Sequence, residues 1–89
     1  MALDISVGQL VESKQGRDKG RLYFVIEVID DNYLKIVDGR YRKLNNPKLK
    51  KNKHLIVYKY KNNDIIEKLD SETLDDISIK KILKSLSRD

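Results

Sequence analysis

A short segment that combines glycine with positive charge is the part of this sequence best suited to binding chemistry. Residues 14–21 hold two glycines and four cations within eight positions. Glycine lets the backbone turn sharply and approach a ligand closely, and cations contact phosphate groups. A solvated hairpin turn has the same composition, so both interpretations stay open for this segment alone. Its candidate binding residues are Lys14, Gln15, Gly16, Arg17, Lys19, Gly20 and Arg21.

Catalytic and metal-binding chemistry has little support in the sequence. The chain has one histidine and no cysteine, and its carboxylates form no recognisable catalytic pair. Gly16 and Gly20 lack the Gly-Lys-Ser/Thr ending of a phosphate-binding P-loop. A lone histidine is also a poor metal site. We therefore predict a protein that is not an enzyme and that has no cofactor and no metal.

A second basic segment follows, and it contains no acid. Between residues 40 and 53 there are seven cations, which would attract polyanions over about one Debye length, ~8 Å at physiological salt. We predict that it contacts nucleic acid, although such a segment can also serve solubility alone. Tyr41, flanked by two arginines, is the candidate for stacking on a base, and His54 is either an ordinary packed residue or a further RNA contact. The cations are Arg40, Arg42, Lys43, Lys48, Lys50, Lys51 and Lys53.

Length and charge distribution limit the kind of protein that this is. The 89 residues suffice for one domain with a small core, and the net charge is +5. Residues 1–61 hold 14 basic and 7 acidic side chains, whereas residues 62–89 hold 5 and 7. The absence of cysteine fits a reducing compartment, and no apolar run approaches the ~20 residues of a membrane span. We expect a cytoplasmic protein that does not bind membranes and is a monomer when free.

Five short strands are predicted in residues 1–61, over 7–14, 22–30, 33–37, 40–44 and 54–60. Residues 22–29 are mostly apolar on both faces, which is typical of a strand in a small closed barrel. Turn residues at 30–32 and the pair Asp38-Gly39 separate the next strands. Pro47 cannot donate a backbone hydrogen bond, so the stretch 48–53 is predicted as an exposed loop or edge.

Residues 62–89 are predicted to form a helical extension. Ile65, Ile66 and Leu69 have the spacing of one short helix. A second helix should begin near Asp75 and carry an apolar stripe of Ile79, Ile82, Leu83 and Leu86. This stripe is either packed on the barrel, and then core, or exposed as the site of a protein partner.

Five elements occur in a distinctive order and spacing: Val7-Gly8, Gly16-Arg17-Asp18-Lys19-Gly20, the apolar run 25–29, the turn Asp30 to Tyr33, and the basic stretch that ends in His54-Leu55. Together they resemble the KOW-domain ribosomal proteins of the archaeal and eukaryotic large subunit. The resemblance covers roughly residues 5 to 58. It differs at Tyr23-Phe24, where many KOW motifs have a further glycine, and the extension from Asn62 onward matches no ribosomal pattern, which suggests a small relative outside the core subunit.

The resemblance implies a five-stranded SH3-like barrel that contacts ribosomal RNA. It implies that the RNA-facing positions are those of the glycine-containing loop together with Arg40, Arg42 and Lys43. We therefore predict a non-catalytic RNA-binding module of the translation apparatus, in which residues 1–61 form the barrel. The alternative is an adaptor that binds ribosomal or transcription proteins through the C-terminal helices.

Overall fold

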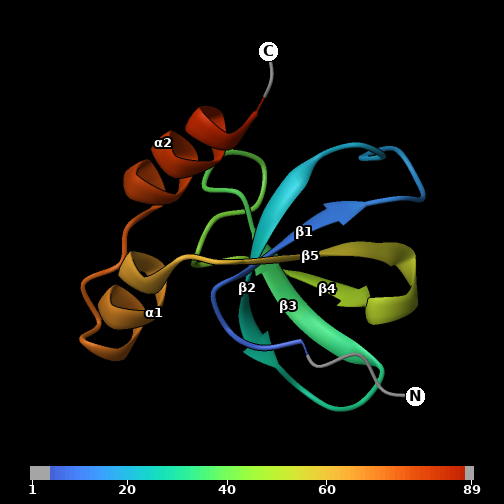
Figure 1. The fold of residues 1–89 in the computed structure, drawn as a ribbon, viewed down its shortest axis with the longest axis horizontal. Helices are drawn as coiled ribbons and strands as arrows, with labels where there is room; N and C mark the ends of the chain where they lie inside the picture. The colour runs from blue at the N-terminus through green and yellow to red at the C-terminus, as the bar shows by residue number, and fades with distance from the viewer. Residues whose placement is uncertain (1–4, 88–89) are drawn as a thin grey trace.

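The computed structural model describes residues 5–87 as a five-stranded antiparallel sheet followed by two helices (Figure 1). The strand order is β4-β3-β2-β1-β5, and within the described residues β4 and β5 are the two unpaired edges. The predicted mainly β chain with a helical C-terminal part is confirmed, but the sheet is not closed into a barrel. The elements are β1 (Gln9–Ser13), β2 (Leu22–Val28), β3 (Tyr33–Val37), β4 (Lys48–Lys51), a 3-10 helix η1 (Asn52–His54), β5 (Leu55–Lys61), α1 (Asn63–Asp70) and α2 (Asp76–Leu86).

The sheet buries apolar side chains on both faces, as the pattern in residues 22–29 predicted. Neighbouring residues of β2 belong to opposite clusters, since Phe24 packs in one and Val25 in the other. The alternation continues to Ile26, which is half-buried against the first cluster, whereas Glu27 and Val28 are exposed beyond the register irregularity between Val25 and Glu27. The second cluster consists of Val11, Tyr23, Val25, Leu34, Ile36 and Leu55.

The two helices cover the first face of the sheet. Ile65 of α1 and Ile79 and Leu83 of α2 are buried in one cluster with Leu10, Phe24 and Val37 of the strands. Figure 1 places both helices on the same side of the sheet, away from the η1 corner. The apolar stripe of the second helix is therefore core and not an exposed partner site.

Capping side chains fix where both helices begin. Asn62 Oδ1 accepts a hydrogen bond from the Ile65 amide at 3.0 Å. Asp75 Oδ1 accepts one from the Ser78 amide at 2.8 Å, and the hydrogen bonds from Ser78 lower the pKa of Asp75. The predicted helix start near Asp75 is confirmed. Within residues 5–87, neither helix is long and apolar enough to span a bilayer.

The predicted strand at residues 40–44 is wrong, and the fourth strand lies at Lys48–Lys51 instead. Asp38 stabilises a tight turn, because its Oδ1 accepts hydrogen bonds from the amides of Arg40 and Arg42 at 2.9 and 2.8 Å. These amides are thereby unable to pair with a neighbouring strand. Pro47 directly precedes β4, which pairs with β3 alone, so the segment predicted as loop or edge begins as an edge strand.

The turn at 38–42 is also fastened to the start of α2. The Leu44 amide donates to Asp76 Oδ1 at 2.8 Å. Gly39 has a φ of +77°, and a Cβ at this position would collide with the carbonyl oxygen of Asp76 and lie 3.0 Å from the Lys80 nitrogen. A residue with a side chain fits neither the backbone angle nor the space. Gly39 therefore allows α2 to rest directly on the turn.

Candidate nucleic-acid interface

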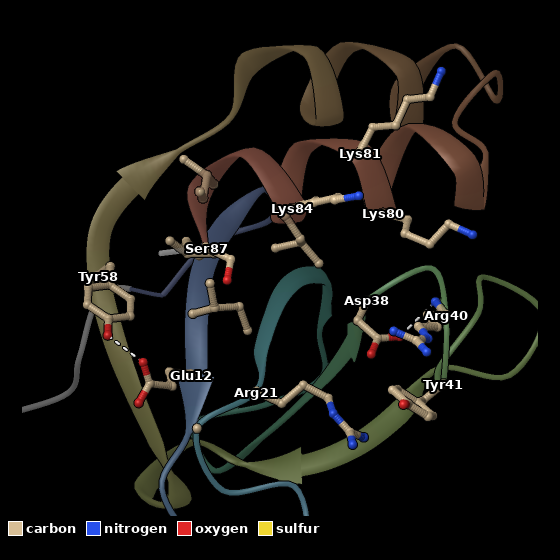
Figure 2. Close-up of a pocket in the computed structure, with 15 residues that line it drawn as sticks. Glu12, Arg21, Asp38, Arg40, Tyr41, Tyr58, Lys80, Lys81, Lys84 and Ser87 are labelled. Atoms are coloured by element: carbon tan, nitrogen blue, oxygen red, sulfur yellow. Dashed lines mark hydrogen bonds between the residues drawn. The ribbon is translucent and has the colours of Figure 1, made fainter. Parts of the chain in front are cut away.

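A groove of about 1190 Å³ lies between α2, the exit of the β1–β2 loop and the turn at 38–41 (Figure 2). Arg21 comes from the loop exit and Arg40 from the turn, and both were predicted from the sequence as RNA contacts. Three lysines of α2 complete the basic lining, namely Lys80, Lys81 and Lys84. Five cations from three separate segments thus line one open groove.

The two long sides of the groove differ in composition. In Figure 2, Lys80 and Lys84 extend from α2 on one side, while Arg21 and Tyr41 lie on the opposite side. Four leucines that are buried or half-buried also line the groove: Leu10, Leu22, Leu83 and Leu86. Cationic side chains therefore border an apolar floor.

Tyr41 is surrounded by arginine side chains, although not the pair that the sequence suggested. The guanidinium carbon of Arg21 lies 3.9 Å from the centroid of the Tyr41 ring, and that of Arg40 lies 5.0 Å away. Both distances are typical of cation–π contacts. Tyr41 as a whole nevertheless remains 58% exposed. Its ring is a planar surface beside the groove, in contact with two guanidinium groups.

The side chain of Asp18 folds back from the loop into a buried polar network. Its Oδ2 accepts from the Tyr23 hydroxyl at 2.7 Å and from Lys48 Nζ at 2.8 Å. Its Oδ1 accepts from the Ser13 hydroxyl at 2.8 Å and lies 3.6 Å from Lys50 Nζ. Asp18 thus joins the loop to β1, β2 and β4.

These contacts shift the proton affinities of the network. Burial alone would raise the pKa of Asp18, but the hydrogen bonds from Lys48, Tyr23 and Ser13 outweigh it and hold that pKa far below its usual value. Burial, followed by the hydrogen bond to Asp18, raises the pKa of Tyr23 to about 12. Asp18 is therefore a carboxylate, and Tyr23 a neutral donor, at any physiological pH.

Lys48 and Lys50 are consequently committed to a partner inside the protein. Their side chains are 25% and 11% exposed, and both face the carboxylate of Asp18. The basic stretch 40–53 contains no acid of its own, but Asp18, which lies 30 residues before Lys48 in the chain, offsets part of its positive charge. We therefore leave these two lysines out of the proposed RNA contact.

Acid titration is expected to expose the role of Asp18. Because folding lowers the pKa of Asp18, the unfolded chain binds the proton first as the pH falls below about 4. The contribution of Asp18 to the free energy of unfolding is therefore complete above about pH 4, and it declines as the pH falls further. Urea unfolding at pH 6, 4, 3 and 2 should show a smaller decline for Asp18→Asn, which cannot titrate. An equal decline in both proteins would contradict this assignment.

The other predicted site residues lie at three places. Lys14, Gln15, Gly16, Arg17, Lys19 and Gly20 are exposed in the β1–β2 loop, and Lys43 is exposed after the turn, beside the half-buried Arg42. Lys51 lies 5.8 Å from the ring of Tyr33, and Lys53 is exposed at the η1 corner. The carbonyl of His54 accepts from the Lys14 amide at 3.1 Å. Burial, followed by the charge of the nearby lysines, lowers the pKa of His54, so it adds no charge at neutral pH.

The lysines of α2 were missed because the charge of residues 62–89 was considered as a whole. The acids of this segment lie mostly between Asp64 and Asp76, whereas Lys80, Lys81 and Lys84 follow without an intervening acid. If the charged residues had been counted separately in the two halves of residues 62–89, an acidic first half and a basic second half would have been distinguished. The position of α2 against the turn then brings the basic part to the groove.

The described residues contain no metal site, and the known proteins add no identification. Among residues 5–87, no three or more His, Asp or Glu side chains gather where they could hold a metal ion. No protein-family model matches the chain, and no curated protein matches it either.

Proposed function

We propose that this chain is a non-catalytic RNA-binding module that associates with ribosomal RNA or the translation apparatus. The observation that carries this proposal is the groove, where cations from the loop, the turn and α2 meet beside an exposed tyrosine. Phosphate contacts supply most of the affinity of such proteins, and aromatic side chains add stacking on bases.

The association with ribosomal RNA rests on the resemblance to KOW-domain proteins. We also propose that the sheet corresponds to their SH3-like barrel, in an open form. Five short strands with apolar clusters on both faces support this correspondence. The adaptor function is not proposed, because the apolar stripe on which it depended is packed against the sheet.

The proposal predicts which lysines determine the salt dependence. If about four of the groove cations meet phosphates, log affinity should fall with log salt with a slope of about −3 for a single strand. Lys80→Gln/Lys84→Gln removes two of these contacts, so the slope should flatten by about 1.4 and the affinity should fall. Fluorescence anisotropy of a labelled RNA from 0.05 to 0.3 M salt measures both quantities.

A matched control changes the same net charge elsewhere. Lys59 and Lys61 are exposed on β5 and do not line the groove. Lys59→Gln/Lys61→Gln should retain the steeper slope and lose much less affinity. Equal losses in the two double variants would show that only net charge matters and would remove the groove from the proposed site.

A further inference from the structure

The apolar floor of the groove distinguishes it from a surface that binds phosphates alone. The four leucines that line the groove, Leu10, Leu22, Leu83 and Leu86, are buried or half-buried, whereas the groove residues Arg40, Lys80 and Lys84 are exposed, so the apolar lining is its floor. A phosphate placed on the leucines would lose water and gain no hydrogen bond. The face of a base, in contrast, is itself apolar and gains from leaving water.

Two carboxylates in the groove point to the same kind of ligand. Figure 2 shows Glu12 beside Tyr58 at one end of the groove and Asp38 beside Arg40 and Tyr41 at the other. Glu12 Oε1 already accepts from the Tyr58 hydroxyl at 2.6 Å. Asp38 is only 6% exposed and its Oδ1 accepts from the amides of Arg40 and Arg42, so it contributes negative charge to its end of the groove. Negative charge at both ends repels a continuous row of phosphates, whereas the Glu12 carboxylate can also accept a hydrogen bond from the amino group of a base.

Tyr41 and Arg21 provide planes on which a base can stack. The Arg21 guanidinium carbon is 3.9 Å from the centre of the Tyr41 ring, and Tyr41 as a whole is 58% exposed. Unpaired bases stack on tyrosine rings and on arginine guanidinium planes. The guanidinium carbon of Arg40, another cation of the groove, lies 5.0 Å from the centre of the same ring.

We infer that the groove binds unpaired RNA, with a base stacked against Tyr41 and Arg21 above the leucine floor and the flanking phosphates on Lys80, Lys84 and Arg40. This inference rests on the proposed function and names its substrate class. A duplex keeps its bases paired and stacked inside, so it can reach the bordering cations but cannot bring a base to the floor. The groove therefore discriminates between unpaired and paired RNA.

The test compares one labelled ten-nucleotide RNA as a single strand and in a blunt duplex, by fluorescence anisotropy at 0.1 M salt. The wild-type protein should bind the single strand about tenfold or more tightly than the duplex. Tyr41→Ala should weaken single-strand binding about 5- to 150-fold, because it removes the stacking surface, and should weaken duplex binding much less, because all the groove cations remain. Tyr41→Phe keeps the ring and should bind as the wild type does. Circular dichroism checks that both variants are folded.

The outcomes separate this inference from the proposed function. If Tyr41→Ala binds the single strand normally, or the duplex binds as tightly as the single strand, the inference is overturned. The proposed function survives that result as long as Lys80→Gln/Lys84→Gln still weakens RNA binding. If neither RNA binds, both fail. Stronger binding of a deca-glutamate peptide than of the single strand would also overturn the inference, because the groove would then serve an acidic protein segment.

Discussion

Replacing Asp18 with alanine is expected to lower the free energy of unfolding by about 3 to 5 kcal/mol, the cost of breaking a buried ion pair by removing one partner. The carboxylate is 6% exposed and faces two lysine ammonium groups. Its removal leaves the Lys48 ammonium and the Tyr23 hydroxyl without the oxygen to which they donate, and Lys50 without its counter-charge. Lys48 retains some access to water, so the loss should lie near the lower end of this range. A domain of 89 residues has only about 5 to 13 kcal/mol in total.

Equilibrium unfolding in urea measures this loss, with Glu27→Ala as the matched control. Glu27 also faces a lysine, since its Oε1 lies 3.8 Å from Lys35 Nζ, but this pair is exposed. Its removal should cost no more than about 1 kcal/mol. Asp18→Asn should fall between the two, because the amide keeps the shape of the side chain without its charge. Equal losses for Asp18→Ala and Glu27→Ala would contradict the role assigned to the network.

Gly39→Ala is expected to lower the free energy of unfolding by about 2 to 5 kcal/mol and to loosen α2. The positive φ contributes about 1 to 2 kcal/mol, and overpacking contributes about 1 to 3 kcal/mol more. The overpacking is severe because the added Cβ meets the backbone of α2 at Asp76 and Lys80, which cannot rotate away as a side chain could. Urea unfolding measures the total, and hydrogen exchange should show faster exchange in α2 than in β1 or β2.

Gly20→Ala separates the two contributions. Gly20 also has a positive φ, +89°, but a Cβ there would meet no atom within 4 Å. This variant should therefore lose only the backbone contribution, and its α2 amides should exchange as in the wild type. If Gly39→Ala is no less stable than Gly20→Ala, α2 does not rest on the turn as described.

Much of the fold could be predicted because local patterns determine it. The apolar residues of β2 and β3 alternate between two buried clusters, and Asp75 caps the helix whose start it indicated. The fourth strand was misplaced because Asp38 and Gly39 are typical of a hairpin turn. In the structure, Asp38 instead accepts from the amides of Arg40 and Arg42, and the Leu44 amide donates to Asp76, a contact across 32 residues that has no local signature.

The candidate site was predictable only in part, for the same reason. Arg21, Arg40 and Tyr41 could be named from the sequence, whereas Lys80 and Lys84 reach the groove only through the packing of α2. The commitment of Lys48 and Lys50 to Asp18 is also a contact over about 30 residues. Charge counts along the chain cannot show which cations a buried acid has already neutralised.

Most acids and most lysines of the last third of the chain lie in different places, which gives the protein an electric dipole. Figure 2 places α1 beyond α2 as viewed from the groove, and α1 carries Asp64, Glu67 and Asp70. A molecule with opposite charges on two sides experiences a torque in the field of a polyanion. If RNA is the partner, as proposed, the protein should rotate during its approach until the groove faces the RNA, so fewer collisions occur in an unproductive orientation.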